Sequence, residues 1–199
     1  VRALSFTGST PIGKLLYRQS ADTIKRLVME LGGHAPFIVF RDADIENAVG
    51  EAIKAKFATT GQDCLAANRM FIERPIYAEF CRKFIAATKQ LTIGKGMDDC
   101  DLGPLMNEKA VQKQEEHVAD AIAKGAKLAC GGKRHILGPL FYQATVLTDV
   151  PATALIMSDE TFGPVAAIAL FDTEEDVVHR ANDTEYGLVA YVHSRDPKR

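Results

Sequence analysis

Hydrophobic residues recur along this chain with two different periods, and the two periods alternate. Short apolar runs bounded by Gly, Pro or Asp are typical of strands, and apolar residues three or four positions apart are typical of helices. The strand pattern occurs at residues 4–6, 37–40, 69–73, 127–130, 142–147, 165–171 and 188–193. The helix pattern occurs at residues 14–19, at 44–58, after Pro75 as far as Leu91, at 108–124 and at 174–182. Strands that alternate with helices predict an α/β fold.

Two residues are expected to limit the helix at 44–58. Asp42 stands just before this helix and is a favoured N-cap residue, and Gly61 follows its apolar stripe. The longest predicted loops lie at 94–104, 131–140 and 149–164. Loops held on a rigid sheet are common places for binding and catalytic residues.

The overall composition excludes several classes of protein. With 199 residues, of which 47% are hydrophobic, the chain can bury its own core and is no disordered tail. Its 24 basic and 26 acidic residues give a net charge of -2, with no basic run dense enough to follow a phosphate backbone, so no nucleic acid partner is expected. The longest apolar run, 165–171, is far shorter than the roughly 20 residues that span a bilayer, so a membrane span is not expected.

The four cysteines fit neither a zinc site nor a disulfide framework. Cys64, Cys81, Cys100 and Cys130 are separated by 17, 19 and 30 positions, whereas zinc-binding cysteines come in close pairs. We therefore expect no metal site and a reducing, cytoplasmic location. Cys81, Cys100 and Cys130 are expected to be structural. Because the chain begins without Met and already in a strand pattern, we expect it to be a fragment of a longer protein.

Residues 8–14 have the form of a phosphate-binding loop, because G-x-x-x-x-G-K stands between a predicted strand and a predicted helix. Leu15 follows, where a nucleoside triphosphatase needs Ser or Thr to hold Mg²⁺, so that activity is not expected. Phosphate binding by the backbone N–H groups at the start of the helix needs no such residue. The alternative is a plain turn between strand and helix.

Three further segments carry side chains with possible chemistry. Glu30 precedes two glycines and is either a general base or a solvated carboxylate before a turn. Cys64 follows a Gly-Gln-Asp sequence, and these polar neighbours favour a partly exposed nucleophile over a buried thiol. Residues 159–164 offer a carboxylate and an aromatic ring to a flat ligand. His34 has no companion residue and is more typical of a structural histidine.

In their order these segments resemble the motifs of the aldehyde dehydrogenase superfamily. The family pattern reads F-T-G-S, E-L-G-G, G-Q-x-C and E-x-F-G-P. The chain has F-T-G-S at 6–9, E-L-G-G at 30–33, G-Q-D-C at 61–64 and E-T-F-G-P at 160–164. The interval of 34 positions from Glu30 to Cys64 also agrees with the family, and the resemblance extends over the whole chain.

The resemblance implies an aldehyde dehydrogenase catalytic domain, a Rossmann-like α/β sheet with flanking helices. Residues 1–32 would be the end of the NAD(P)-binding domain, and residues 33–199 would be a catalytic domain that is incomplete at its C-terminus. Cys64 would attack the carbonyl of a small aldehyde, and Glu30 would activate the water that hydrolyses the resulting thioester. The cofactor would be NAD or NADP.

The resemblance also assigns the residues that face the cofactor. Gly8 and Ser9 would face its pyrophosphate, and the backbone around Leu31 would contact its carboxamide. Glu160 would bind the nicotinamide ribose, and Phe162 would position the nicotinamide ring. The full-length protein would be a homo-oligomer.

Within the superfamily the chain is most similar to the succinate-semialdehyde dehydrogenases, on the basis of residues 33–40 and 108–135. Many members have an Arg six residues before the catalytic Cys, where it can pair with the substrate carboxylate, but this chain has Ala58. Many also have a second Cys two residues after the first, but this chain has Ala66. We therefore predict an altered or relaxed preference for acidic aldehydes and no redox disulfide at Cys64.

A second hypothesis comes from what the chain does not contain. The residues for thioester chemistry are present, whereas most of the cofactor-binding surface of a complete family member is not. The chain on its own would then act as a thiol esterase or as an interaction module. Ester hydrolysis without dehydrogenation would favour this hypothesis.

Overall fold

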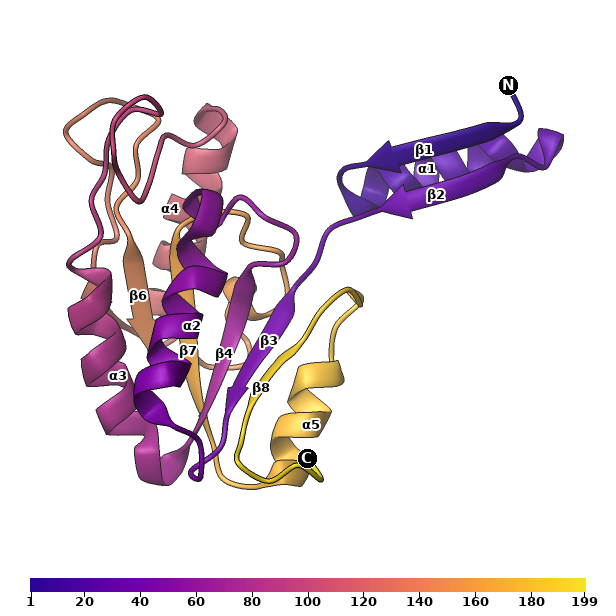
Figure 1. Ribbon diagram of the computed structural model, residues 1–199. Helices are drawn as coiled ribbons and strands as arrows, with labels where there is room; N and C mark the ends of the chain where they lie inside the picture. Colours follow the sequence, from indigo (N-terminus) through magenta and orange to yellow (C-terminus); the bar gives the residue numbers. More distant parts are fainter.

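The computed structural model describes residues 1–199 and contains two sheets of very different size, with two and six strands (Figure 1). The strands are β1 (Ala3–Thr7), β2 (Arg26–Glu30), β3 (Ala35–Val39), β4 (Ala67–Glu73), β5 (Lys127–Cys130), β6 (Thr145–Thr148), β7 (Val165–Phe171) and β8 (Tyr191–His193). The α-helices are α1 (Thr10–Ser20), α2 (Ile45–Phe57), α3 (Arg74–Thr88), α4 (Glu108–Ala123) and α5 (Glu174–Asn182). The predicted α/β fold is confirmed.

The large sheet has six strands in the order β5-β6-β7-β4-β3-β8. All neighbouring pairs are parallel except β5 and β6. Every residue of β4 is buried, as are six of the seven in β7. Strands covered on both faces have mostly apolar sequences, as the seven apolar residues at 165–171 show, whereas 69–73 begins with Arg69 and ends with Glu73.

Helices cover both faces of this sheet (Figure 1). On one face, Phe57 of α2 and Phe80 and Phe84 of α3 pack against alternate residues of β3, β4 and β7. On the other face, Val118 of α4 and Val177 of α5 pack against the remaining strand residues. The sheet and these four helices form one layered body with a core on each side, and no helix combines the length and apolar character needed to cross a membrane.

The first 30 residues form a separate β1–α1–β2 arm that projects from this body (Figure 1). β1 and β2 pair in parallel, with Leu4 opposite Leu27. The sequence analysis did not predict β2. Its residues alternate between exposed and half-buried, although its sequence, R-L-V-M-E, has the same pattern as R-M-F-I-E at 69–73 in β4.

The structure corrects the expected boundaries of several elements. The N-cap of α2 is Asp44, whose side chain accepts a hydrogen bond from the Asn47 N–H at 3.1 Å. Asp42 instead accepts from the Ser194 hydroxyl at 2.9 Å, so it links the start of α2 to the residues after β8. The strands expected at 142–147 and 188–193 are shorter, because only 145–148 and 191–193 reach a neighbouring strand.

Candidate active site

A cavity of about 520 Å³ lies between the arm and the body, and all seven predicted site residues line it. They come from both parts of the molecule: Gly8, Ser9, Glu30 and Leu31 from the arm and the segment that follows it, and Cys64, Glu160 and Phe162 from the body. The candidate residues are up to 154 positions apart, between Gly8 and Phe162. The sheet topology brings them together.

An unusual backbone conformation precedes Cys64. After α2 ends, Thr59, Thr60 and Gly61 have φ values of 50°, 61° and 69°. Positive φ is unfavourable for the β-branched threonines. The Thr60 hydroxyl compensates by accepting from the Gly103 N–H at 2.9 Å. This strained turn ends α2 and presents Cys64 to the cavity.

The Cys64 thiol is partly exposed, as predicted. Burial is the main cause that raises its pKa, and the neighbouring Asp63 carboxylate raises that pKa further. The thiol is therefore protonated at neutral pH, and attack on a carbonyl requires a proton acceptor. The Cys64 backbone N–H donates to no backbone carbonyl, which leaves it available to an oxyanion.

Glu30 is the last residue of β2, and its exposed carboxylate lines the same cavity as Cys64. The chain after it passes so close to the nucleophile that a Cβ on Gly33 would lie 2.0 Å from the Cys64 carbonyl oxygen. Only glycine fits there. This contact fixes the end of the arm against the loop that carries Cys64, so that Glu30 and the thiol line one cavity.

The loop at 159–164 closes the cavity from the other side. Oε1 of Glu160 accepts a hydrogen bond from the Gly33 N–H at 2.9 Å, and burial raises the pKa of this carboxyl group. Phe162 has a φ of 48°. The buried side chain of Gln114 on α4 donates from Nε2 to the Thr161 carbonyl at 3.0 Å and thereby holds the loop against α4.

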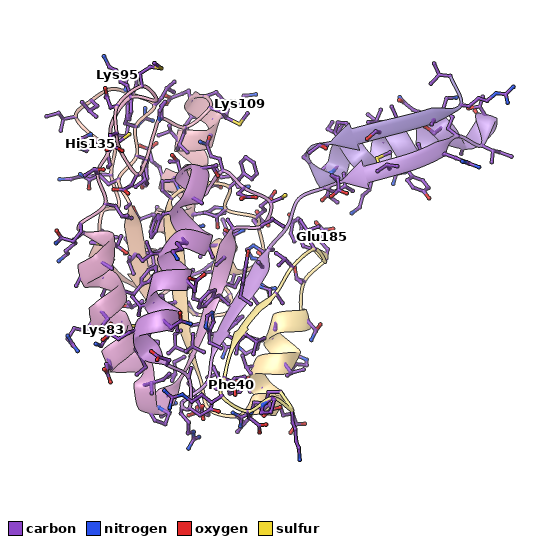
Figure 2. The ribbon with its side chains drawn as sticks, in the orientation of Figure 1. Phe40, Lys83, Lys95, Lys109, His135 and Glu185 are labelled. Carbon is purple, nitrogen blue, oxygen red and sulfur yellow. The ribbon has the colours of Figure 1, made fainter.

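The start of α1 opens into the cavity and suits a phosphate. Ser9 is the N-cap, yet its side chain makes no capping hydrogen bond. The first N–H bond of the helix runs from Gly13 to the Ser9 carbonyl at 3.0 Å, so the N–H groups of Ser9, Thr10 and Ile12 donate to no backbone carbonyl. The Gly8 N–H instead donates to the Glu30 carbonyl at 3.0 Å. Lys14 is not positioned as a phosphate-loop lysine, because its Nζ lies 3.0 Å from the carboxylate of Glu185, a residue of the body that is labelled in Figure 2. The nucleoside triphosphatase reading is therefore not supported.

The sequence analysis missed a buried lysine beneath the site. Lys56 of α2 is fully buried, and its Nζ donates to Oδ1 of Asn68 at 2.8 Å. Burial lowers the pKa of Lys56 to about 7, and the charge of Glu160 partly opposes this shift. Nδ2 of Asn68 in turn contacts the Gly33 carbonyl at 3.5 Å. The sequence contained a signal for this burial. Lys56 comes four positions after the buried Ala52, which places both residues on the apolar face of the helix.

His34 lies behind the site and does not reach the cavity. It is buried, and its ring packs 5.7 Å from that of Tyr186. Burial lowers its pKa to about 3, with the nearby Arg69 charge as the next cause. A neutral, enclosed imidazole fits the expected structural histidine.

The sequence matches the family described as “Aldehyde dehydrogenase family” over residues 1–199. Over 200 aligned residues it is 52% identical to the NADP-dependent succinate-semialdehyde dehydrogenase GabD of Escherichia coli K12, with 100% of this chain and 42% of that protein covered. It is 48% identical over 200 residues to the glutarate-semialdehyde dehydrogenase of Pseudomonas aeruginosa, with 100% and 41% covered.

A solved structure gives the same picture. Succinate-semialdehyde dehydrogenase from Burkholderia pseudomallei is 52% identical and superposes with a TM-score of 0.98, covering 100% of this chain and 41% of that one. The chain therefore spans about two fifths of the length of these relatives, with 42% of one and 41% of the other covered.

Proposed function

Because this chain belongs to the aldehyde dehydrogenase family, we propose that it forms the catalytic part of an enzyme that oxidises an aldehyde to a carboxylic acid with NAD or NADP. Residues 1–32 are the end of the cofactor-binding domain in this proposal, and residues 33–199 belong to the catalytic domain. The observation that carries it is the one cavity lined by a thiol, three carboxylates, an aromatic ring and a helix N-terminus.

The residues around the cavity fit one end of a nicotinamide dinucleotide. At the start of α1, the N–H groups that have no backbone partner suit a pyrophosphate, and so does the Ser9 hydroxyl, which makes no capping hydrogen bond. The Glu160 carboxylate suits ribose hydroxyls, the Phe162 side chain suits a flat ring, and the backbone around Leu31 suits a carboxamide. When bound, the cofactor accepts a hydride from the substrate.

The steps assigned to the protein start at Cys64. Its thiol loses a proton to solvent water, the thiolate sulfur forms a bond to the carbonyl carbon, and the backbone N–H of Cys64 stabilises the negative charge that develops on oxygen. Loss of hydride from the same carbon leaves a thioester on the sulfur. Glu30 then takes a proton from water, hydroxide adds to the thioester, and the carbon–sulfur bond breaks to release the acid and regenerate Cys64.

Substitutions at the two catalytic residues test the proposal by different readouts. In the protein as its source makes it, Cys64→Ser is expected to lower the rate of NAD(P)H formation by about 1000-fold, because a weakly acidic hydroxyl replaces the thiol. Glu30→Gln is expected to retain one rapid turnover of NAD(P)H and to lose steady-state turnover, since only hydrolysis needs the base. Cys100→Ser, outside the cavity, is the control and should behave like the parent.

Full activity of Cys64→Ser would overturn the proposal. Hydrolysis of a simple ester by the parent, with no NAD(P)H formed from any aldehyde, would favour the thiol esterase instead. Succinate semialdehyde is the first substrate to test, given the names of the relatives. The cytoplasmic location and the homo-oligomer stay predictions, which cell fractionation and light scattering test directly.

A further inference from the structure

A second cavity, of about 550 Å³, lies on the other side of the Cys64 loop. Its walls come from the last turns of α2, from the loop and from the β8 region. Asp63 lines both cavities, so they meet at the loop that carries Cys64. The Cys64 side chain lines the first cavity, whereas its neighbours Asp63 and Leu65 line the second. Because the first cavity carries the features that suit a cofactor, the second is the space beside the nucleophile for the chain of a bound aldehyde.

The charged groups of the second cavity are arranged by depth. Asp63 lies beside the nucleophile, belongs to no ion pair, and accepts the Leu65 N–H at 2.9 Å. Lys54 and Glu51 stand farther back on α2. His193 also lines the wall, but burial lowers its pKa, so the ring is neutral at pH 7. The cavity therefore has one carboxylate at the loop, Asp63, and on α2 a single cation, Lys54, that is paired with Glu51.

Lys54 is free to bind a ligand at this position. Its Nζ lies 3.0 Å from Glu51, but the side chain is 75% exposed, and such surface pairs are weak. Ala58 lies one helical turn closer to Cys64 on the same wall, about 6 Å along the axis. A carboxylate at the depth of Ala58 would meet Asp63 and no cation, whereas one that reaches past Ala58 would meet Lys54.

We propose that Lys54 binds the carboxylate of the substrate and, together with Asp63, selects ω-oxo acids longer than succinate semialdehyde. The inference rests on the proposed function and names the substrate class of the same site. Asp63 repels a carboxylate held close to the aldehyde, and Lys54 attracts one held farther away. Five- and six-carbon semialdehydes therefore bind better than the four-carbon one.

The test compares kcat/KM for four-, five- and six-carbon ω-oxo acids with that for uncharged aldehydes of equal length, in the protein as its source makes it. The parent is expected to prefer the five- and six-carbon acids over the four-carbon acid by about tenfold. Lys54→Ala should lower the ratio of acid to uncharged aldehyde by about tenfold, mainly through KM, as for the loss of one charge-assisted hydrogen bond. Lys54→Arg should preserve the ratio.

Asp63→Asn should raise kcat/KM for the four-carbon acid relative to the longer acids. Lys95→Ala is the control, because Lys95 lies on the loop after α3 and lines neither cavity (Figure 2). Equal losses on acids and uncharged aldehydes in Lys54→Ala, or a parent preference for the four-carbon acid, would overturn the inference. Absence of NAD(P)H formation from every aldehyde, uncharged ones included, would instead contradict the proposed function.

Discussion

The arm and the body are both built from strands and helices, but the fraction of residues that is buried differs greatly between them. In β4 of the body every residue is buried, whereas no residue of β1 or β2 is. Helix α1 buries only Gly13 and Ser20. A two-stranded sheet with one helix has little stability of its own. The arm nevertheless supplies Glu30 and Ser9 to the cavity, so their placement depends on the junction with the body.

The largest expected effect is on the free energy of unfolding, which a core substitution in the body should lower much more than a substitution in the arm. Phe84 is fully buried, and its ring centroid lies 5.8 Å from that of Phe80. Phe84→Ala should lower the free energy of unfolding by about 3–5 kcal/mol, because it leaves a cavity in the core. Leu15→Ala in the arm, at a side chain that is 45% exposed, should cost less than about 1 kcal/mol. Urea unfolding measures both, and equal losses would refute the contrast.

The next effect concerns the junction. Gly33→Ala would force a Cβ against the Cys64 carbonyl oxygen, which belongs to backbone and cannot turn away. The displacement should lower kcat/KM by about 100-fold, as small misplacements of catalytic groups do. Gly50→Ala on α2, where a Cβ meets nothing within 4 Å, should keep full activity and gain about 0.5–1 kcal/mol of stability. Normal activity of Gly33→Ala would show that the junction is adaptable.

Acid should weaken the body and spare the arm, which contains no histidine. Burial lowers the pKa of His34 to about 3 and that of His117 to about 4, against about 6.5 in the unfolded chain. Below pH 6.5 the unfolded state binds more protons, so stability is lost as the pH falls toward 4. The expected loss between pH 6.5 and 5 is about 2 kcal/mol for each group.

Urea unfolding at the two pH values measures this loss. Replacing His117 with Gln should roughly halve the difference in unfolding free energy. An unchanged pH dependence in a variant that lacks both histidines would assign it to other groups.

The smallest expected effect is at the ion pair between Lys14 of the arm and Glu185 of the body. The two side chains are 57% and 59% exposed, and such pairs contribute about 0.5 kcal/mol or less. Lys14→Ala should therefore speed hydrogen exchange of arm amides only slightly, and high salt should remove the difference. Lys25→Ala, at an arm lysine outside any ion pair, is the control. A large increase in exchange would mean that this pair holds the arm.

The body could be predicted from the sequence, and the arm only in part. The continuous apolar run of β7 located a central strand because both of its faces are buried. β2 was missed although R-L-V-M-E at 26–30 has the same pattern as R-M-F-I-E at 69–73 in β4, so the local pattern does not distinguish an exposed arm strand from a buried body strand. The cap at Asp44 was missed because Asp42 has the same local chemistry, and only its distant partner Ser194 separates the two roles.

For the candidate site too, local motifs identify the residues, whereas long-range strand pairing determines where they lie. Motif resemblance named seven residues, and the structure brings all seven to one cavity. The sheet order that unites them comes from pairings between residues far apart in the chain, such as Met70 with Ile168, and no local pattern gives it. The Lys56 and Gln114 supports were missed because their partners lie on other elements.

Two contacts between main-chain atoms set limits on redesign of this protein. Gly33 meets the Cys64 carbonyl oxygen, and a Cβ on Gly61 would lie 2.3 Å from the carbonyl oxygen of Gly163. At both places one main chain rests directly on another, so no larger residue can be accommodated by a change of rotamer. A mutant library designed to find new substrates should therefore leave Gly33 and Gly61 unchanged and vary the residues of the second cavity, such as Lys54 and Ala58.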